Sequence, residues 1–191
     1  MRVQPNMTVI VPADAEEARK AILATAATPY PTYIRFTREK SPVMTTEATS
    51  FEIGKAIVCY EGENSEVTVI ACGPLLYNAL QAAHELAGEG VSVTVINNHT
   101  VKPLDIETIV SSVQKTKAVV TVEEHQIAGG MGSAIAEALA ARLPVPFEFI
   151  GVHDSFGQSG TPDELIEHYG MGVFAIKEAI KKVITRKLPS V

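Results

Sequence analysis

The pattern of apolar and polar residues predicts an α/β protein. Short runs rich in valine and isoleucine, typical of strands buried on both faces, alternate with segments whose apolar residues recur every three or four positions. The runs predict strands over residues 7–12, 32–36, 55–60, 67–72, 91–96, 118–122 and 147–150. The periodic segments predict helices over 14–26, 76–87, 106–114, 130–142 and 173–184, and a shorter helix near 162. We therefore expect a three-layer α/β/α fold with a mostly parallel sheet.

The beginning of the chain predicts one β-α-β unit. Asp14 is placed to cap its helix, and Glu17, three residues later, to complete a capping box. Ala18, Ile22 and Ala26 form the expected apolar stripe of that helix. A lone unit of this kind cannot bury both faces of its strands, so we expect more sheet beside it. We interpret the chain as beginning inside a domain.

Residues 37–50 are polar and rich in threonine, which indicates a linker. We place a domain boundary near residue 45, so that residues 1–45 form the end of one domain and residues 46–191 form a second. The first strand of the second domain is followed by a short polar turn that leaves no room for a crossover helix. That first strand should therefore run antiparallel to the next one.

Composition and charge exclude several classes of protein. The net charge is −6, which argues against nucleic-acid binding because such proteins need a basic face. No apolar run is long enough to span a bilayer, and the first residues lack the form of a signal peptide. Cys59 and Cys72 form no metal or redox motif and are expected to be reduced thiols. We expect a cytoplasmic protein without membrane contact.

The richest cluster of polar groups follows the strand over 118–122. Glu123, Glu124 and His125 are expected to form a polar turn before the glycine-rich segment Gly129–Ser133. In open α/β sheets, ligands and partners meet the protein at the carboxyl ends of the strands. This corner is therefore the candidate interface or ligand rim. Three further polar residues in loops after strands are expected near the same rim: His99, His153 and Asp154.

The sequence leaves open what this corner does. The two carboxylates and the imidazole could form an acid–base set or a metal site. However, adjacent residues at a strand end point in different directions. The simpler interpretation is that one carboxylate caps a helix or meets a partner domain, and that His125 bonds within its own loop. Likewise, Gly129–Ser133 could bind an anion at a helix N-terminus or could allow close packing of loops.

Five motifs in order resemble the C-terminal domain of the transketolase family. They are Val67–Gly73, Lys102–Asp105, Val122–His125, Gly129–Ser133 and Gly151–Gly157. The resemblance covers residues 50–185. The tail, with Phe156-Gly157 and Ser159-Gly160, is most similar to split or archaeal-type transketolases. In those proteins the N- and C-terminal halves can be separate polypeptides.

Residues 1–42 resemble the end of the family's pyrimidine-binding domain. The matching positions are Arg2, Pro5, Asn6, Pro12, Asp14, Glu17, Thr37, Arg38, Glu39 and Pro42. The resemblance implies that Arg38 contacts the sugar phosphate of the substrate, with Arg35 taking this role if the register slips. The alternative is that Arg38 is an ordinary arginine that ends a strand in solvent.

The resemblance also implies a reaction and partners for the complete assembly. Transketolases move a two-carbon ketol unit between sugar phosphates and use thiamine diphosphate with Mg²⁺. Their cofactor site needs a Gly-Asp-Gly segment and an activating glutamate, and neither region occurs in this chain. We expect the chain alone to bind no cofactor and to be inactive, with no catalytic or metal-binding residue of its own. It should act as a structural, dimer-forming section that joins an N-terminal cofactor-binding partner.

Two alternatives remain at this stage. The chain could be the corresponding part of a deoxyxylulose-phosphate synthase or of the β part of a 2-oxo-acid dehydrogenase E1. It could also be a stand-alone α/β module that binds a ligand or a partner. No G-x-G-x-x-G motif follows the first strand, which counts against dinucleotide binding.

Overall fold

The computed structural model describes residues 1–187. Its strands are β1 (Thr8–Ile10), β2 (Thr32–Ile34), β3 (Ile57–Glu61), β4 (Val67–Ala71), β5 (Val93–Asn97), β6 (Thr100–Lys102), β7 (Val119–Gln126) and β8 (Phe147–Val152). Its α-helices are α1 (Ala15–Ala26), α2 (Leu76–Gly88), α3 (Ile106–Thr116), α4 (Met131–Ala140), α5 (Pro162–His168) and α6 (Val173–Thr185), and a 3₁₀ turn, η1 (Gly73–Leu75), precedes α2. Every predicted strand and helix is present, and β6 is an addition.

The main sheet has the order β3-β5-β4-β7-β8. Strands β5, β4, β7 and β8 are parallel, and β3 runs antiparallel to them at one edge of the sheet. The predicted direction of the first strand is therefore confirmed. Its neighbour in the sheet is β5 and not β4, because β4 already pairs on both sides with parallel strands.

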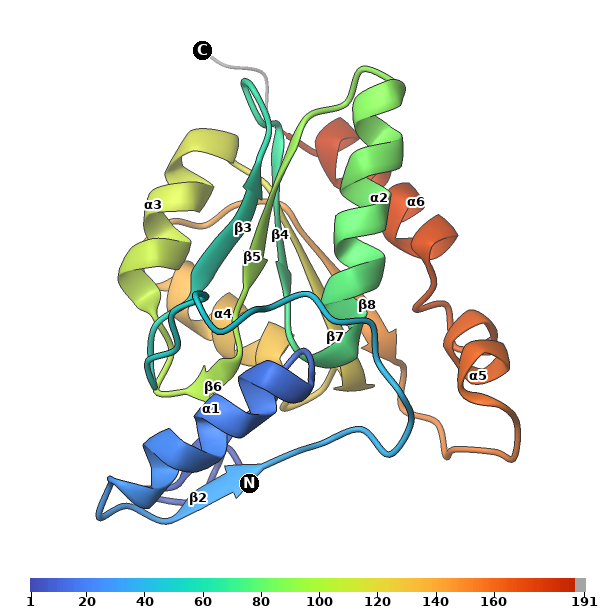
Figure 1. The fold of residues 1–191 in the computed structure, drawn as a ribbon. Coiled ribbons are helices and arrows are strands. Elements are labelled where there is room, and N and C mark those ends of the chain that lie inside the picture. The colour runs from blue at the N-terminus through green and yellow to red at the C-terminus, as the bar shows by residue number, and fades with distance from the viewer. Residues whose placement is uncertain (188–191) are drawn as a thin grey trace.

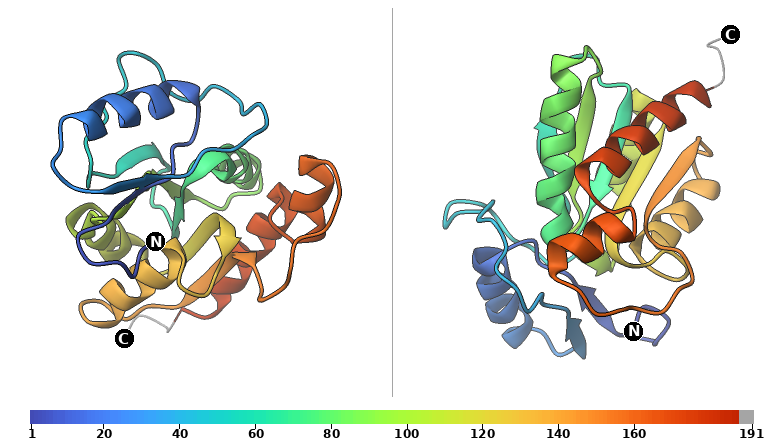
Figure 2. Two further views of the ribbon diagram at one scale, coloured as in Figure 1. Left: turned by 90° about the horizontal axis from the view of Figure 1, so that it is seen from below. Right: turned by 90° about the vertical axis from the view of Figure 1, so that its right-hand side faces the viewer.

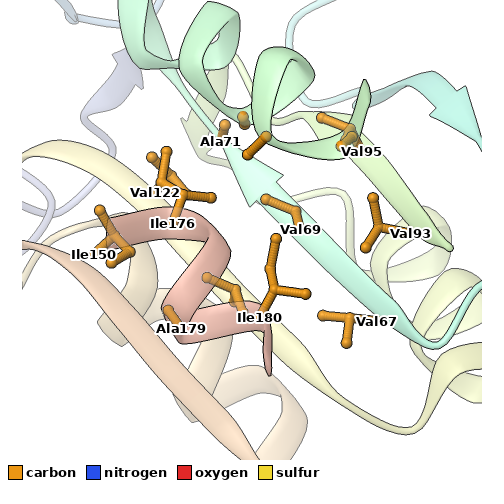
Figure 3. Packing of buried hydrophobic residues seen from close by; sticks show 14 of the residues in the cluster. Val67, Val69, Ala71, Val93, Val95, Val122, Ile150, Ile176, Ala179 and Ile180 are labelled. Carbon is orange, nitrogen blue, oxygen red and sulfur yellow. The ribbon is translucent and has the colours of Figure 1, made fainter. Parts of the chain in front are cut away.

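Helices cover both faces of this sheet, which confirms the three-layer prediction (Figure 1). Helices α2 and α6 pack on one face, and α3 and α4 pack on the other. Because side chains alternate along a strand, Val67 and Val69 of β4 join the α2–α6 side, whereas Ile70 joins the α3–α4 side. Figure 3 shows how Ile176 and Ile180 of α6 meet the valines of the sheet.

The N-terminal segment forms a second, smaller sheet with the order β2-β1-β6. Strands β1 and β2 are parallel and are joined by α1, so the predicted β-α-β unit is confirmed. The sequence predicts no strand between residues 96 and 118, and this is wrong for Thr100–Lys102, which pair antiparallel with β1. A strand of three residues takes its conformation from a distant partner and leaves no local periodicity. The unit lies across the carboxyl edge of the main sheet (Figure 2).

Helix α1 turns an unexpected side toward the protein. Asp14 caps the helix as predicted, because its carboxylate accepts a hydrogen bond from Glu17 N at 2.9 Å. The buried residues of the helix are Glu17 and Ala21. The predicted apolar stripe is wrong, since Ile22 is 52% exposed and Leu23 60% exposed. The apolar side of α1 therefore lies uncovered on the molecular surface.

Candidate functional site

The main sheet has a topological switch point between β4 and β7. The chain leaves β4 through α2 to reach β5 on one side, and then passes through α3 to reach β7 on the other side. Open α/β sheets bind their ligands outside the carboxyl ends of the strands at such a point. Here, Cys72 follows β4, and Glu123–Gln126 end β7. The candidate corner identified in the sequence is thus the switch point of the sheet.

A cavity of about 170 Å³ lies at this point. The main domain contributes Cys72, Glu123 and His125 to its wall, and the N-terminal unit contributes Tyr33 and Arg35. The β-α-β unit therefore covers the edge at which a ligand or partner would otherwise approach the main sheet.

Glu123 caps helix α4 from inside the protein. Its side chain is buried, and its two carboxylate oxygens accept hydrogen bonds from Met131 N at 2.7 Å and from Gly132 N at 2.8 Å. Burial raises the pKa of this carboxyl, while the two N–H groups act to lower it. The interpretation that one carboxylate caps a helix is confirmed. The anion at this helix N-terminus is the protein's own side chain.

The glycines of this corner make room for that carboxylate. A Cβ atom on Gly130 would overlap an oxygen of Glu123 and would lie 2.7 Å from Gln126 O. A Cβ atom on Gly132 would lie 2.5 Å from the hydroxyl of Thr121. The alternative of close packing therefore accounts for the glycine cluster.

The residues after Glu123 continue strand β7, so the predicted polar turn is wrong. The strand extends because its register with β8 resumes at Gln126 and Val152. Glu124 reaches Arg35 of the N-terminal unit, with 3.5 Å between a guanidinium nitrogen and a carboxylate oxygen. His125 is exposed, and its Nδ1 lies 2.7 Å from Gln126 O, which confirms that it bonds within its own segment.

Gln126 is a structural residue that the sequence reasoning missed. Its side-chain oxygen accepts a hydrogen bond from Asp154 N at 2.9 Å, and its side-chain nitrogen donates to Ser155 O at 2.8 Å. Asp154 and His153 are exposed in the loop after β8, beside the end of β7. The only available signal was that an amide side chain, which both donates and accepts, follows the polar motif directly.

His99 does not lie on an accessible rim. It is fully buried, its ring stacks on Phe51 with centroids 4.3 Å apart, and its Nδ1 lies 3.0 Å from the hydroxyl of Thr100. Burial lowers the pKa of His99 to about 4, so the ring is neutral at physiological pH. The expectation was wrong because β6, which follows His99, pairs with β1 and encloses it.

Glu17 is a second buried carboxylate, and it lies between the two parts of the protein. One oxygen accepts a hydrogen bond from Ala13 N at 2.7 Å, and the other accepts one from the side-chain amide of Asn97, also at 2.7 Å. The predicted capping box is therefore wrong in detail, because Glu17 bonds Ala13 and not the capping residue. Burial raises the pKa of Glu17 to about 7.

Arg38 lies away from the cavity on the segment that follows β2. Its side chain is 95% exposed, and its ion-pair partner is Glu39 at 3.6 Å. It lines an open groove of about 770 Å³ that also borders α2 and α5. Arg35, the alternative contact for the substrate, forms an ion pair with Glu124. Within residues 1–187, no group of three or more histidine, cysteine or acidic residues could hold a metal ion.

Taken together, the fold and site define an open α/β domain whose switch-point edge is sealed by part of a second α/β unit. The family model described as "Transketolase, C-terminal domain" matches residues 54–176, and the chain belongs to this family.

Several proteins described as transketolase subunits or sections match almost the whole chain. A 6-deoxy-6-sulfo-D-fructose transketolase subunit of Clostridium sp. (strain MSTE9) is 42% identical over 187 residues, which are 98% of this chain and 58% of that protein. A putative transketolase C-terminal section of Methanocaldococcus jannaschii is 37% identical, again over 98% of this chain and 58% of the relative. The chain thus spans somewhat over half the length of these relatives.

A solved structure described as a split gene transketolase, inactive beta4 tetramer, is similar in fold and sequence. It is 41% identical with a TM-score of 0.94, covering 98% of this chain and 61% of that one. Separately, the helices within residues 1–187 include none with the length and apolar character required to traverse a bilayer.

Proposed function

We propose that this chain is the C-terminal section of a thiamine-diphosphate-dependent transketolase, which transfers a two-carbon ketol unit between sugar phosphates. The observation that carries the proposal is the match of 98% of the chain to subunits described as transketolases at 41–42% identity. Transketolase chemistry is preferred over deoxyxylulose-phosphate synthase chemistry because relatives described as transketolases are 41–42% identical, whereas a deoxyxylulose-phosphate synthase of Desulfitobacterium hafniense is 35% identical.

The partner in this proposal is an N-terminal section that carries the cofactor site. The uncovered side of α1 supports it, since Ile22 and Leu23 are exposed apolar residues on an ordered helix. The outer edge of β2 is unpaired within the described sheet and adjoins the exposed aromatic side chains of Tyr30 and Phe36. Exposed apolar groups beside a free strand edge are typical of a surface that another module covers.

Thiamine diphosphate and Mg²⁺ belong to the complete assembly in this proposal, and the isolated chain is expected to bind neither. We also propose that the assembly contains two copies of this chain. The solved relative is described as a beta4 tetramer, so a chain of this kind can associate with copies of itself. A cytoplasmic location is proposed because Cys59 and Cys72 are free thiols, as expected in a reducing compartment.

Arg38 is the proposed contact for the anionic end of the substrate. Its exposed guanidinium supports this role, since a planar fork of N–H donors suits phosphate and sulfonate oxygens. The substrate in the name of the Clostridium relative carries a sulfo group at its far end, which is an anion of the same kind.

The proposal is tested by combining this chain with a candidate N-terminal section, thiamine diphosphate and Mg²⁺. The two polypeptides should co-elute in size-exclusion chromatography and should transfer a ketol unit from a ketose phosphate to an aldose phosphate. Absence of both co-elution and transfer with the N-terminal sections of the split relatives would contradict the proposal.

A further inference from the structure

Arg38 lies on a segment of backbone that is held at its ends. Residues 36–43 contain no helix or strand. Just before them, Arg35 N donates a hydrogen bond to Ile10 O at 3.0 Å, and the guanidinium of Arg35 faces the carboxylate of Glu124. The segment therefore starts from a residue that is tied both to its own sheet and to β7.

A second clamp holds the other end of the segment. Asp14 accepts hydrogen bonds from Met44 N at 2.7 Å, from Thr45 N at 2.6 Å and from the hydroxyl of Thr45 at 2.7 Å. Between the clamps, no hydrogen bond within residues 1–187 fixes residues 36–43 to the rest of the protein. The position of Arg38 thus depends on how firmly the two ends are held.

Glu124 is presented by a stiff part of the main domain. Its neighbour Glu123 is buried and bonded to the first turn of α4. Two residues further along, the side chain of Gln126 is bonded to Asp154 and Ser155. Strand β7 pairs with β8 at Val122 and again at Gln126, so the backbone is held on either side of Glu124 across a shift in register.

We propose that Glu124 is a positioning residue for the substrate-binding arginine. By holding Arg35, it fixes the start of residues 36–43 and sets where Arg38 meets the anionic end of the sugar substrate. This inference rests on the function proposed above. The Arg35–Glu124 pair is about one-third exposed and so contributes little to stability. We therefore expect the pair to affect substrate affinity and not stability. Through this pair, the C-terminal domain takes part in substrate binding.

The test uses the assembled enzyme and two acceptors, D-ribose 5-phosphate and D-ribose. Glu124→Gln should raise the KM for D-ribose 5-phosphate by about 5-fold, which corresponds to ~1 kcal/mol, because a partly exposed ion pair is worth this much. The kcat should change by less than about twofold, because the reacting groups are not displaced. The kinetics with D-ribose should not change, since this acceptor offers no anion to Arg38.

Three further variants sharpen the test. Arg38→Ala should raise the KM for the phosphorylated acceptor at least as much as Glu124→Gln does. Glu124→Asp, which keeps the charge, should have an intermediate effect. Glu137→Gln removes the ion pair with Arg2, which also joins the N-terminal segment to the main domain, and should leave both acceptors unaffected. An equal effect on both acceptors, or no effect of Glu124→Gln or Arg38→Ala on the phosphorylated one, would overturn the inference.

If the wild-type assembly transfers no ketol unit, the proposed function fails. Limited trypsin digestion of the isolated chain then tests separately whether Glu124 holds residues 36–43. Glu124→Gln should accelerate cleavage after Arg38 and Lys40 by about 3-fold or more relative to Glu137→Gln, because proteases cut segments in proportion to their local opening. Equal cleavage rates would show that Glu124 does not hold this segment.

Discussion

The polar residues that end β7 have different roles because side chains alternate along a strand. Glu123 points into the protein and caps α4, whereas Glu124 reaches the N-terminal unit. Gln126 anchors the loop after β8. The side chains of Glu123, Glu124 and Gln126 therefore hold three segments against the end of β7 at the switch point.

Gly130→Ala should destabilise the protein by about 2 kcal/mol, because the added Cβ overlaps the buried carboxylate of Glu123 and the structure must shift. Urea unfolding of the purified chain measures this. Gly157→Ala is the matched control, since a Cβ there meets no atom within 4 Å. Equal midpoints for the two variants would show that the corner tolerates the extra atom.

Glu17→Gln should stabilise the protein at alkaline pH. The pKa of Glu17 is raised to about 7 from an ordinary value of 4.5, so this group costs nothing below pH 4.5 and stability falls as the pH rises from about 4.5 to 7. Glutamine removes that dependence on pH. Its side-chain amide can donate a hydrogen bond to the unpartnered side-chain oxygen of Asn97 once the amide of Asn97 is flipped. The gain over wild type should be about 2 kcal/mol larger at pH 8 than at pH 5 in urea unfolding. Identical pH profiles would refute it.

At the scale of whole elements, local periodicity predicted every helix and all strands except β6. The strand residues alternate or run continuously apolar, and caps such as Asp105, which accepts a hydrogen bond from Thr108 N, mark helix starts. What could not be predicted depends on distant partners. The pairing of β6 with β1 and of β3 with β5 joins segments that no local pattern connects.

The same limit applies to the site. Its location at the end of β7 could be predicted from the order of elements, but the direction of each side chain could not. His99 was placed on a rim because it follows a strand, and only the pairing of β6 reveals that it is enclosed. Likewise, the apolar stripe of α1 was predicted to be core, although Ile22 and Leu23 are more than half exposed in the described part of the chain.

Helix α6 should contribute to stability through its sheet-facing side only. Ile180→Ala should cost about 3 kcal/mol, because this side chain is fully buried against the sheet and its loss leaves a cavity. Phe174→Ala, on the same helix, removes a side chain that is 73% exposed and should change the unfolding free energy by less than about 0.5 kcal/mol. Thermal and urea unfolding compare the two, and similar losses would contradict the packing described here.

At the scale of the whole molecule, the N-terminal unit is fastened to the main domain on one side and uncovered on the other. Lys102 donates hydrogen bonds to the carbonyl oxygens of Arg2 and Gln4, and Arg2 pairs with Glu137. The domain boundary near residue 45 remains a prediction, since β6 of the main domain completes the sheet of the N-terminal unit. We propose the uncovered side as the surface on which the N-terminal section docks.

Leu23→Glu should weaken association with the N-terminal section by about tenfold or more, because it buries a charge in the proposed apolar contact. Leu23 is already solvated in the isolated chain, so the stability of that chain should hardly change. His84→Glu, at an exposed position of α2, is the control. Surface plasmon resonance with the immobilised partner measures both, and equal affinities would remove α1 from the interface.

The central claim is that this chain completes a cofactor site held by another polypeptide. Its most direct test is a calorimetric titration of thiamine diphosphate and Mg²⁺ into the isolated chain, into the N-terminal section and into their mixture. The account predicts no binding by the isolated chain and the tightest binding by the mixture. Saturable, tight binding by the isolated chain, or the same affinity with and without it, would contradict the claim.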